Sequence, residues 1–334
     1  MKVLIIGGTG TISSPITSKL ASNTDIDLYV LNRGNKKLPS GAKQIIGDFN
    51  DVEMMKELAL KEKYDVVINF IVFRLEQAKA QIEIFQNNIK QYIFISTVAT
   101  YNHETAVFIN ENHEQYNKYS PYGQEKAACE QLFLKANNFP VTIVRPSQTY
   151  SDSRIPLSLK GKSCYSVIDR ILKDKPVIVH GDGKSTWHST HANDFSKGFV
   201  PLVGNMKSIN EAYQIVNDEI ANWDMIYNHL YKLLNKKPNI IHRSSDFLAL
   251  SKKYDNTGAF LGDKQYSCVY DTSKIKKINP NFVCEIDIKK GLQMYLEYLE
   301  SQPEEKIIDD EYDQWCDTII ASYQQFSNTM IGKF

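Results

Sequence analysis

The chain has 334 residues, of which 42% are hydrophobic and 23% are charged, an ordinary composition for a globular protein of about two domains. Lys plus Arg and Asp plus Glu each total 39, so the formal net charge is zero and the basic field of a dedicated nucleic-acid-binding protein is missing. Five scattered cysteines without a CxxC pair argue against a disulfide framework or a zinc site, and no apolar run reaches the ~18 residues that span a bilayer. These features favour a cytoplasmic protein with reduced thiols that does not enter a membrane.

Short apolar runs rich in Val and Ile alternate with amphipathic stretches through the first part of the chain. Strands are predicted at 3–6, 28–31, 45–46, 66–68, 92–95 and 141–144, and helices at 15–22, 52–62, 76–86 and 119–137. Continuous apolar strands between helices are typical of a parallel sheet that is covered on both faces. We therefore predict an α/β fold in which residues 1–150 form a doubly wound parallel sheet of the Rossmann type, with ligands beyond the carboxyl ends of its strands.

The pattern becomes irregular after Pro146. Helices are predicted at 167–172, 195–200, 225–234, 288–301 and 309–326, a strand at 177–179, a loop at 180–191, and a return to the sheet at 212–216. The sequence therefore predicts a smaller, interleaved substrate-binding region made of 151–176 and 218–334, with 177–217 partly returning to the first domain.

The turn between the first predicted strand and the first predicted helix reads GGTGTIS over residues 7–13. Gly7 and Gly10 keep two positions of a GxxGxxG pattern, and Ser13 replaces the third glycine with a small residue that is expected to pack against the strand. Glycine lets the backbone approach a pyrophosphate, and the helix N-terminus at Thr11 and Ile12 offers N–H groups to the phosphates. A plain tight turn is the alternative, but the position between strand and helix favours a dinucleotide site.

The acidic residue that usually follows the second strand of such a fold and binds the adenosine ribose is missing here. Asn32 is expected to hydrogen-bond the ribose instead, and Arg33 to pair with a 2′-phosphate, supported by Lys36 or Lys37. NADP is therefore slightly favoured over NAD as the cofactor. A solvated basic loop is the alternative reading of this stretch.

Polar residues also end the third and fourth predicted strands. Asp48, followed by Phe49, is placed to hydrogen-bond the adenine amino group. Asn69, followed by Phe70, would lie near the cofactor's phosphates and ribose. Either polar residue could instead cap its loop.

Tyr122 and Lys126 are four residues apart in a predicted helix and therefore share one face. A tyrosine that exchanges a proton with a substrate hydroxyl needs a pKa below its usual value of about 10, and the Lys126 ammonium would lower it while holding the nicotinamide ribose. Thr97 ends the fifth strand 25 residues earlier (122 − 97), where its hydroxyl would hydrogen-bond the reacting oxygen. YxxxK alone also fits a surface tyrosine and lysine, but its combination with the glycine turn and Thr97 is more specific.

With these motifs in this order, the sequence resembles the extended short-chain dehydrogenases/reductases, the family of NAD-dependent sugar epimerases, dehydratases and reductases. The resemblance covers most of the chain, through GGTGTIS, GDF, ISTVATY, YGQEK, VRP and HGDGKSTWHSTHANDF. It implies that Tyr122, Lys126 and Thr97 are catalytic and that the enzyme moves a hydride on a sugar or nucleotide-sugar-like substrate. It also implies a homodimer formed through the long helices. The LNRG stretch and the GDG…W…TH…DF loop are similar to a subgroup related to chloroplast stem-loop-binding proteins.

The sequence departs from that family at two places. Sugar 4,6-dehydratases carry Asp-Glu after the catalytic Thr, where this chain has Val98 and Ala99, so the resemblance argues against dehydratase chemistry. Nucleotide-sugar enzymes usually carry an Arg after the GDG loop, where this chain has Trp187, which can stack on a sugar or base but cannot form charged hydrogen bonds. The candidates for replacing that arginine are Arg154, Arg170 and Arg243.

The substrate pocket is expected to draw on six residues: Thr97, Tyr122, Ser147, Trp187, His191 and Arg243. The spacing of His188 and His191 invites a metal site, but their loop offers no other ligands, so no metal is predicted and a pocket or structural role is favoured. Asp194 is predicted to cap the helix that follows.

An RNA-binding or cofactor-sensing protein on the same fold is the alternative to an enzyme. Such relatives tend to lose the tyrosine, whereas this chain keeps Tyr122 and Lys126 and has no net positive charge. The sequence therefore favours a small-molecule substrate over a nucleic acid. It does not separate an epimerase, which returns the hydride to the substrate, from a reductase or dehydrogenase, which releases its cofactor.

Overall fold

The structure, a computed structural model, describes residues 1–333 and contains two compact units. The first unit comprises 1–151, 188–220 and 268–285, and the second comprises 152–187, 221–267 and the chain from 286 onward. These boundaries differ from the predicted ones at 177–187, which belongs to the second unit, and at 268–285, which belongs to the first. Both differences have the same cause, because each segment carries a strand that pairs within its own unit.

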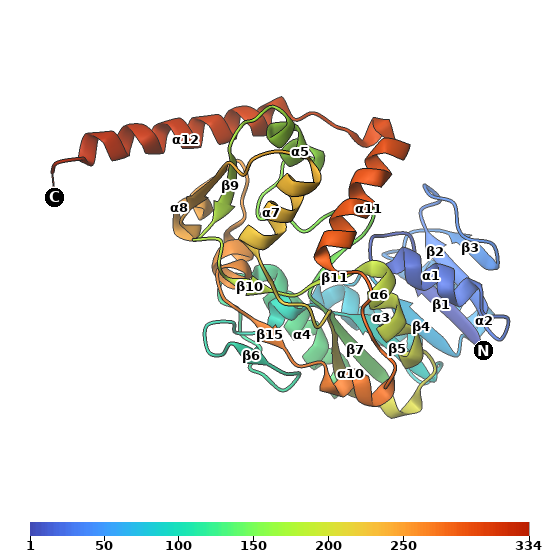
Figure 1. Cartoon of the computed structure of the whole chain (residues 1–334). Helices are drawn as coiled ribbons and strands as arrows, with labels where there is room; N and C mark the ends of the chain where they lie inside the picture. Colours follow the sequence, from blue (N-terminus) through green and yellow to red (C-terminus); the bar gives the residue numbers. More distant parts are fainter. Residues whose placement is uncertain (334) are drawn as a thin grey trace. The chain divides into compact units, whose positions relative to one another are not determined.

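The first unit is built on one seven-stranded sheet (Figure 1). Its strands lie in the order β3 (Ala42–Ile46), β2 (Asp27–Asn32), β1 (Lys2–Ile6), β4 (Val66–Asn69), β5 (Gln91–Ile95), β7 (Val141–Pro146) and β12 (Glu211–Ile215). All neighbouring strands are parallel. The order runs outward in both directions from β1 and β4, which confirms the predicted doubly wound Rossmann sheet and places its switch point at their carboxyl ends.

Helices cover both faces of this sheet (Figure 1). One face carries α2 (Val52–Glu62), α3 (Leu75–Phe85) and α4 (Pro121–Lys135), and the other carries α1 (Ser13–Ala21), α6 (Ala192–Phe199) and α10 (Ser273–Ile278). Strand β1 shows why the four residues after Lys2 are all apolar. Leu4 and Ile6 belong to one core cluster, Val3 and Ile5 belong to the other, and all four are fully buried. A strand covered on both faces needs an apolar residue at every position.

Short strand pairs complete both units. In the first, β6 (Phe108–Ile109) pairs with β15 (Val269–Tyr270), and β8 (Gln148–Tyr150) pairs with β11 (Ser189–His191). In the second, β9 (Val177–His180) pairs with β14 (Ile240–Arg243), and β10 (Thr186–Trp187) pairs with β13 (Ala221–Asn222). The prediction of a loop over 180–191 is therefore wrong at 186–187 and 189–191, because β10 and β11 each pair with a strand that is distant in sequence.

The described part of the second unit also contains six α-helices. They are α5 (Tyr165–Leu172), α7 (Trp223–Leu233), α8 (Ser245–Ala249), α9 (Thr257–Ala259), α11 (Ile288–Ser301) and α12 (Asp310–Met330). Among residues 1–333, no helix is long and apolar enough to cross a membrane.

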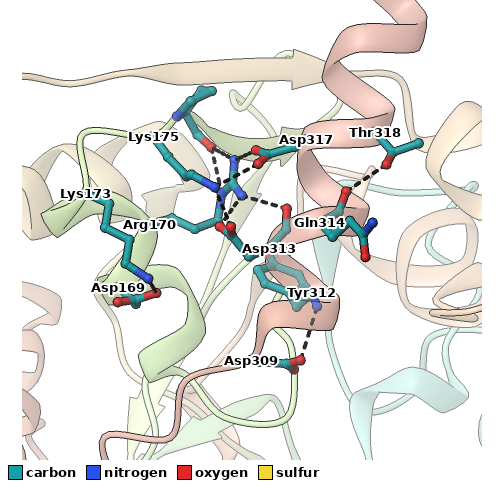
Figure 2. Close-up of polar contacts among 11 residues, drawn as sticks. Asp169, Arg170, Lys173, Lys175, Asp309, Tyr312, Asp313, Gln314, Asp317 and Thr318 are labelled. Atoms are coloured by element: carbon teal, nitrogen blue, oxygen red, sulfur yellow. Dashed lines mark hydrogen bonds and ion pairs between the residues drawn. The ribbon is translucent and has the colours of Figure 1, made fainter.

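A cluster of charged residues fixes α12 to α5 (Figure 2). Arg170 is 1% exposed and pairs with the carboxylates of Asp313 and Asp317 at 2.5 and 2.8 Å. Lys175 pairs with the same two carboxylates. The remaining hydrogen bonds of the guanidinium go to the carbonyl oxygens of Pro176 and Asp313, so its five N–H donors are all used. The expectation that Arg170 could replace the missing substrate arginine is therefore wrong.

Candidate active site

The glycine turn leads from β1 into α1. Gly7 has a φ of +84°, in the left-handed region that favours glycine. A Cβ atom on Gly8 would lie 2.7 Å from Cγ1 of Val30, so Gly8 allows the turn to pack closely against β2. Ser13 is 2% exposed, and its Oγ accepts a hydrogen bond from the N–H of Gly10 at 2.8 Å. Ser13 therefore fixes the shape of the turn through a hydrogen bond, which the sequence had not indicated.

The N-terminus of α1, which begins after Thr11 and Ile12, has no side-chain cap in the described chain. The first amide groups of a helix have no partner within the helix itself. Together with the positive end of the helix dipole, they favour an anion such as a phosphate.

A cavity of about 460 Å³ lies in front of this turn, at the carboxyl ends of β1, β2 and β3. Six of the predicted cofactor residues line it: Gly7, Gly10, Asn32, Arg33, Asp48 and Phe49. The predicted residues that are not among its walls are Thr11, Ile12, Asn69, Phe70 and Lys126. The walls also include Thr9 and Ile71, which the sequence had not singled out although they adjoin the glycine turn and the end of β4. The volume is within the range of small-molecule sites.

Asn32 carries an unsatisfied donor at the wall of this cavity. Its Oδ1 accepts hydrogen bonds from the N–H of Gly34 at 2.8 Å and from Nε2 of Gln44 at 2.9 Å. Its Nδ2 is buried and has no partner within residues 1–333. A buried donor without an acceptor is costly, and a ribose hydroxyl would supply that acceptor. The residues present at this position therefore fit a dinucleotide.

Basic side chains outnumber acidic ones around the cavity. Arg33 forms no ion pair in the described part of the chain, and Nζ of Lys36 approaches the carbonyl oxygen of Thr9 at 3.4 Å. Asp48 is the acidic wall residue, and its Oδ1 accepts hydrogen bonds from the backbone and side chain of Asn50, both at 2.9 Å. The positive charges of Arg33 and Lys36 exceed the negative charge of Asp48, so the cavity wall suits a ligand that carries a phosphate near Arg33.

Asn69 and Phe70 support the cavity without lining it. Asn69 is fully buried; its Oδ1 accepts a hydrogen bond from the N–H of Ile71 at 2.9 Å, and its Nδ2 donates to Gln81 at 3.1 Å. This is the loop-cap role that the sequence left open for Asn69. Phe70 packs against Phe199 of α6, with ring centroids 6.1 Å apart.

Lys126 lies at the end of β5, where α4 crosses the sheet. The side chain is 1% exposed, and Nζ donates hydrogen bonds to the carbonyl oxygens of Val72 and Ile95 at 2.5 and 2.8 Å. Burial lowers the pKa of Lys126 to about 7. Its Nζ is 5.9 Å from the ring centroid of Tyr122, so the two residues of the YxxxK motif do face the same region.

Tyr122 and the Thr97 segment are positioned by the start of α4. Ser120 caps this helix, its Oγ accepting the N–H of Gly123 at 3.0 Å. A Cβ atom on Gly123 would lie 2.1 Å from the carbonyl oxygen of Ala99, so a larger residue could not occupy this close approach. The hydroxyl oxygen of Thr97 accepts the N–H of Ala99 at 3.1 Å, and Tyr122 is 46% exposed. The structure thus brings α4 against the end of β5 and leaves Tyr122 accessible.

A buried network of charged and polar side chains connects α4 with β7, and the sequence had not predicted it. Arg145 and Glu130 are 4% and 0% exposed and pair at 2.5 Å. Nη1 of Arg145 also donates to the hydroxyl of Tyr101 at 2.9 Å, and Tyr101 donates to Gln214 at 3.1 Å. Arg145 belongs to the VRP stretch and Tyr101 to the ISTVATY stretch. These two motifs were therefore the signal from which the network could have been predicted.

The remaining predicted substrate residues fall in both units and are largely buried. In the first unit, the hydroxyl of Ser147 donates to the carbonyl oxygen of His188 at 2.7 Å, and His191 is 1% exposed. In the second unit, Trp187 is 4% exposed, and the guanidinium of Arg243 lies 4.0 Å from the ring centroid of Tyr323 in α12.

His188 and His191, whose spacing invited a metal site, have structural contacts instead. His188 approaches the carbonyl oxygen of Asn217 at 2.5 Å through Nδ1, and its Nε2 accepts the N–H of Tyr270 at 3.3 Å. Burial lowers the pKa of His188. His191 caps α6 by accepting the N–H of Asn193. The predicted cap, Asp194, is wrong, because it lies inside the first turn of that helix. No group of three metal-ligating side chains exists within residues 1–333.

Comparison with known proteins identifies the family of the chain. A model of the NAD dependent epimerase/dehydratase family matches residues 3–216. The chain belongs to this family. This confirms the resemblance to extended short-chain enzymes, whereas the narrower resemblance to chloroplast stem-loop-binding proteins stays a prediction.

Its relatives include both epimerases and dehydratases. A dTDP-D-glucose 4,6-dehydratase of Dictyostelium discoideum is 26% identical over 66% of this chain and 60% of its own length. A UDP-glucose 4-epimerase of Lactobacillus helveticus is 29% identical over 56% of this chain and 62% of its own length. The matched part of the chain thus spans only 60% and 62% of these two relatives.

Solved structures share the fold at low identity. The UDP-glucuronic acid 4-epimerase of Bacillus cereus, in complex with UDP-glucuronic acid and NAD, has a TM-score of 0.72 and 20% identity over 90% of this chain and 99% of that chain. The epimerase Mth375 of Methanothermobacter thermautotrophicus has a TM-score of 0.72 and 16% identity over 91% and 94%. These likenesses show the fold.

Proposed function

We propose that the chain is an NAD(P)-dependent epimerase or reductase that transfers a hydride at a hydroxyl-bearing carbon of a sugar or nucleotide-sugar-like substrate. The observation that carries this proposal is Lys126, buried at the end of β5 beside an accessible Tyr122. Burial lowers the pKa of Lys126 to about 7, and a lysine of this kind beside an accessible phenol is the pairing that proton exchange with a hydroxyl requires. Membership of the NAD dependent epimerase/dehydratase family supports the same chemistry.

Tyr122, Lys126 and Thr97 divide the proton chemistry between them. When the substrate is oxidised, its O–H proton passes to Oη of Tyr122 and its C–H electron pair leaves as hydride. Bound NAD or NADP supplies the hydride acceptor. Lys126, when charged, stabilises the phenolate of Tyr122 that accepts the proton. Thr97 accepts the N–H of Ala99 and can therefore direct its own O–H at the reacting oxygen.

The choice of cofactor depends on Arg33. We propose NADP as the slightly preferred cofactor because Arg33 borders the cavity without an ionic partner in the described chain. The NAD-bound structural relatives make NAD the alternative. Val98 and Ala99, which stand where dehydratases carry Asp-Glu, favour an epimerase or reductase over a 4,6-dehydratase.

Two measurements test this proposal: the identity of any cofactor that the protein releases, and the affinity of the stripped protein for added cofactor. The purified chain is denatured and the supernatant is analysed for nicotinamides, and stripped protein is titrated with NADPH and NADH. NADPH is expected to bind more tightly, and Arg33→Gln is expected to weaken NADPH about tenfold while leaving NADH unchanged. Lys37→Gln, a neighbouring lysine outside the cavity wall, is the matched control.

Each outcome has a distinct meaning. Tightly retained NAD would favour an epimerase and contradict the role of Arg33. No retained cofactor with preferential NADPH binding would favour a reductase. If neither cofactor binds at millimolar concentration, the enzyme proposal and the cofactor-sensing alternative both fail, and the RNA-binding alternative replaces them. The homodimer and the cytoplasmic location stay predictions.

A further inference from the structure

The second unit contains a cavity of about 280 Å³ that none of the motifs above explains. Its walls are formed by residues of the segment 153–164, by the C-terminal half of α11 and by residues of the stretch 305–307. None of these residues belongs to the glycine turn, the YxxxK motif or the cavity at the end of β1.

The walls of this cavity carry more positive charge than the chain neutralises. Arg154 forms no hydrogen bond or ion pair with any residue in 1–333, and the printed partner of the Lys160 ammonium is the carbonyl oxygen of Gly161 at 3.4 Å. Lys162 faces two carboxylates, Asp309 at 3.9 Å and Glu311 at 4.0 Å, so the unneutralised charge comes from Arg154 and Lys160. Glu305 is the acidic wall residue. The chain as a whole has no net charge, so this local excess of cations is not a general feature of its composition.

Tyr295 adds an unsatisfied donor. The residue is 2% exposed and lines the cavity, and its hydroxyl makes no hydrogen bond in the described part of the chain. The hydroxyl oxygen is not among the fully buried atoms that lack a partner, so it can be reached from the cavity. Burial raises the pKa of Tyr295, so the hydroxyl keeps its proton and can donate it.

The cavity is held open by the chain itself. Asp309 is 3% exposed and accepts the N–H of Lys162 at 2.7 Å and the N–H of Tyr312, in the first turn of α12, at 3.1 Å. These bonds fasten the stretch before α12 to the segment 153–164. A ligand would therefore enter a formed site rather than one that must be assembled.

We propose that this cavity binds a small phosphate-type oxyanion, either free phosphate or the phosphate group of a sugar phosphate, through Arg154, Lys160 and the hydroxyl of Tyr295. A guanidinium, an ammonium and a neutral hydroxyl together offer the charged and directed hydrogen bonds that a tetrahedral oxyanion accepts. The site goes beyond hydride transfer and does not depend on it.

The test uses the full chain and inorganic phosphate as the probe. Isothermal titration at constant ionic strength, with chloride as the reference salt, is carried out on the wild type and on single variants. Arg154→Gln is expected to weaken phosphate binding about tenfold, and Lys160→Gln and Tyr295→Phe by a few-fold. Lys252→Gln removes an exposed lysine of the same unit that does not line the cavity and should leave binding unchanged.

Tyr295→Phe keeps the test decisive even if a charge change disturbs folding, because it removes only a hydroxyl that has no protein partner. No phosphate binding by the wild type, or binding that Arg154→Gln, Lys160→Gln and Tyr295→Phe all leave intact, would overturn the proposal. The second result would place the anion elsewhere, for example at the turn of α1. A parallel titration with glucose 1-phosphate distinguishes the two sources: tighter binding than inorganic phosphate assigns a sugar phosphate, and equal binding assigns the free ion.

Discussion

Each unit of the chain contains a lysine whose ammonium is held by two backbone carbonyls. Lys126 of the first unit donates to Val72 and Ile95 at 2.5 and 2.8 Å, and Lys264 of the second donates to Leu157 and Ser158 at 3.0 and 2.9 Å. Burial lowers both pKa values, to about 7 for Lys126 and about 8 for Lys264. By hydrogen bonding and pKa alone, the two lysines cannot be told apart.

The residues around each lysine distinguish Lys126 from Lys264. The ammonium of Lys126 lies 5.9 Å from the ring centroid of Tyr122, an accessible phenol, behind Phe73 at 4.5 Å and Phe94 at 4.8 Å. The ammonium of Lys264 lies 5.0 Å from the ring centroid of Trp223, and its backbone carbonyl accepts hydrogen bonds from Ser185 at 2.6 Å and from His180 at 3.0 Å. Lys264 therefore connects four parts of its own unit, at 157–158, 180, 185 and 223. Lys126 instead lies near Tyr122, whose hydroxyl can exchange a proton. A lowered lysine pKa marks a functional site only when a reactive partner stands beside it.

The largest expected effect comes from removing that partner. Tyr122→Phe should lower kcat by about 10² to 10⁴ because the proton acceptor is lost, while cofactor binding stays within about twofold. Steady-state kinetics and a cofactor titration measure both. If Lys126 acts through Tyr122, adding Lys126→Met to Tyr122→Phe should cost much less activity than Lys126→Met costs alone.

Lys264→Met supplies the control for that cycle. It should leave the kcat of the folded protein unchanged in the wild type and in Tyr122→Phe alike, since Lys264 has no part in the proton transfer. Full activity in Tyr122→Phe would remove the basis for treating the two lysines differently.

The surroundings of Lys126 could be predicted from the sequence, whereas those of Lys264 could not, and the reason is physical. Strand β1 and the YxxxK helix are predictable because local patterns encode them: apolar residues at every position of a doubly covered strand, and four-residue spacing on one helical face. Lys264 meets Leu157 across 107 residues, and no local period marks such a pairing. The cap of α6 failed for a related reason, because His191 is held by β11, a short strand that its sequence does not reveal.

Stability should not distinguish the two lysines. Lys126→Met and Lys264→Met each leave two buried carbonyl oxygens without their donor, so each should lower the free energy of unfolding by about 1 to 3 kcal/mol near neutral pH. Urea denaturation of the cofactor-free chain measures this. Lys126→Met should also lose activity, whereas Lys264→Met, once folded, should retain the wild-type kcat. A selective loss of kcat in Lys264→Met would show that the second unit contributes to the chemistry.

The smallest expected effect is a change in how steeply the free energy of unfolding varies with pH. The usual lysine pKa is 10.5, and both lysines are lowered in the folded chain, so between the lowered and the usual value the unfolded chain binds more protons. Each lysine therefore makes the free energy of unfolding rise with pH, by about 1.4 kcal/mol per pH unit, from about pH 7 for Lys126 and about pH 8 for Lys264 up to about pH 10. Buried thiols such as Cys129, whose pKa burial raises to about 11, give the opposite slope, so the quantity to follow is the difference between wild type and variant. That difference should grow with pH for both methionine variants and should begin about one pH unit earlier for Lys126→Met. A difference that stays flat from pH 7 to 10 would mean that the carbonyl pair, rather than burial, sets the charge of that lysine.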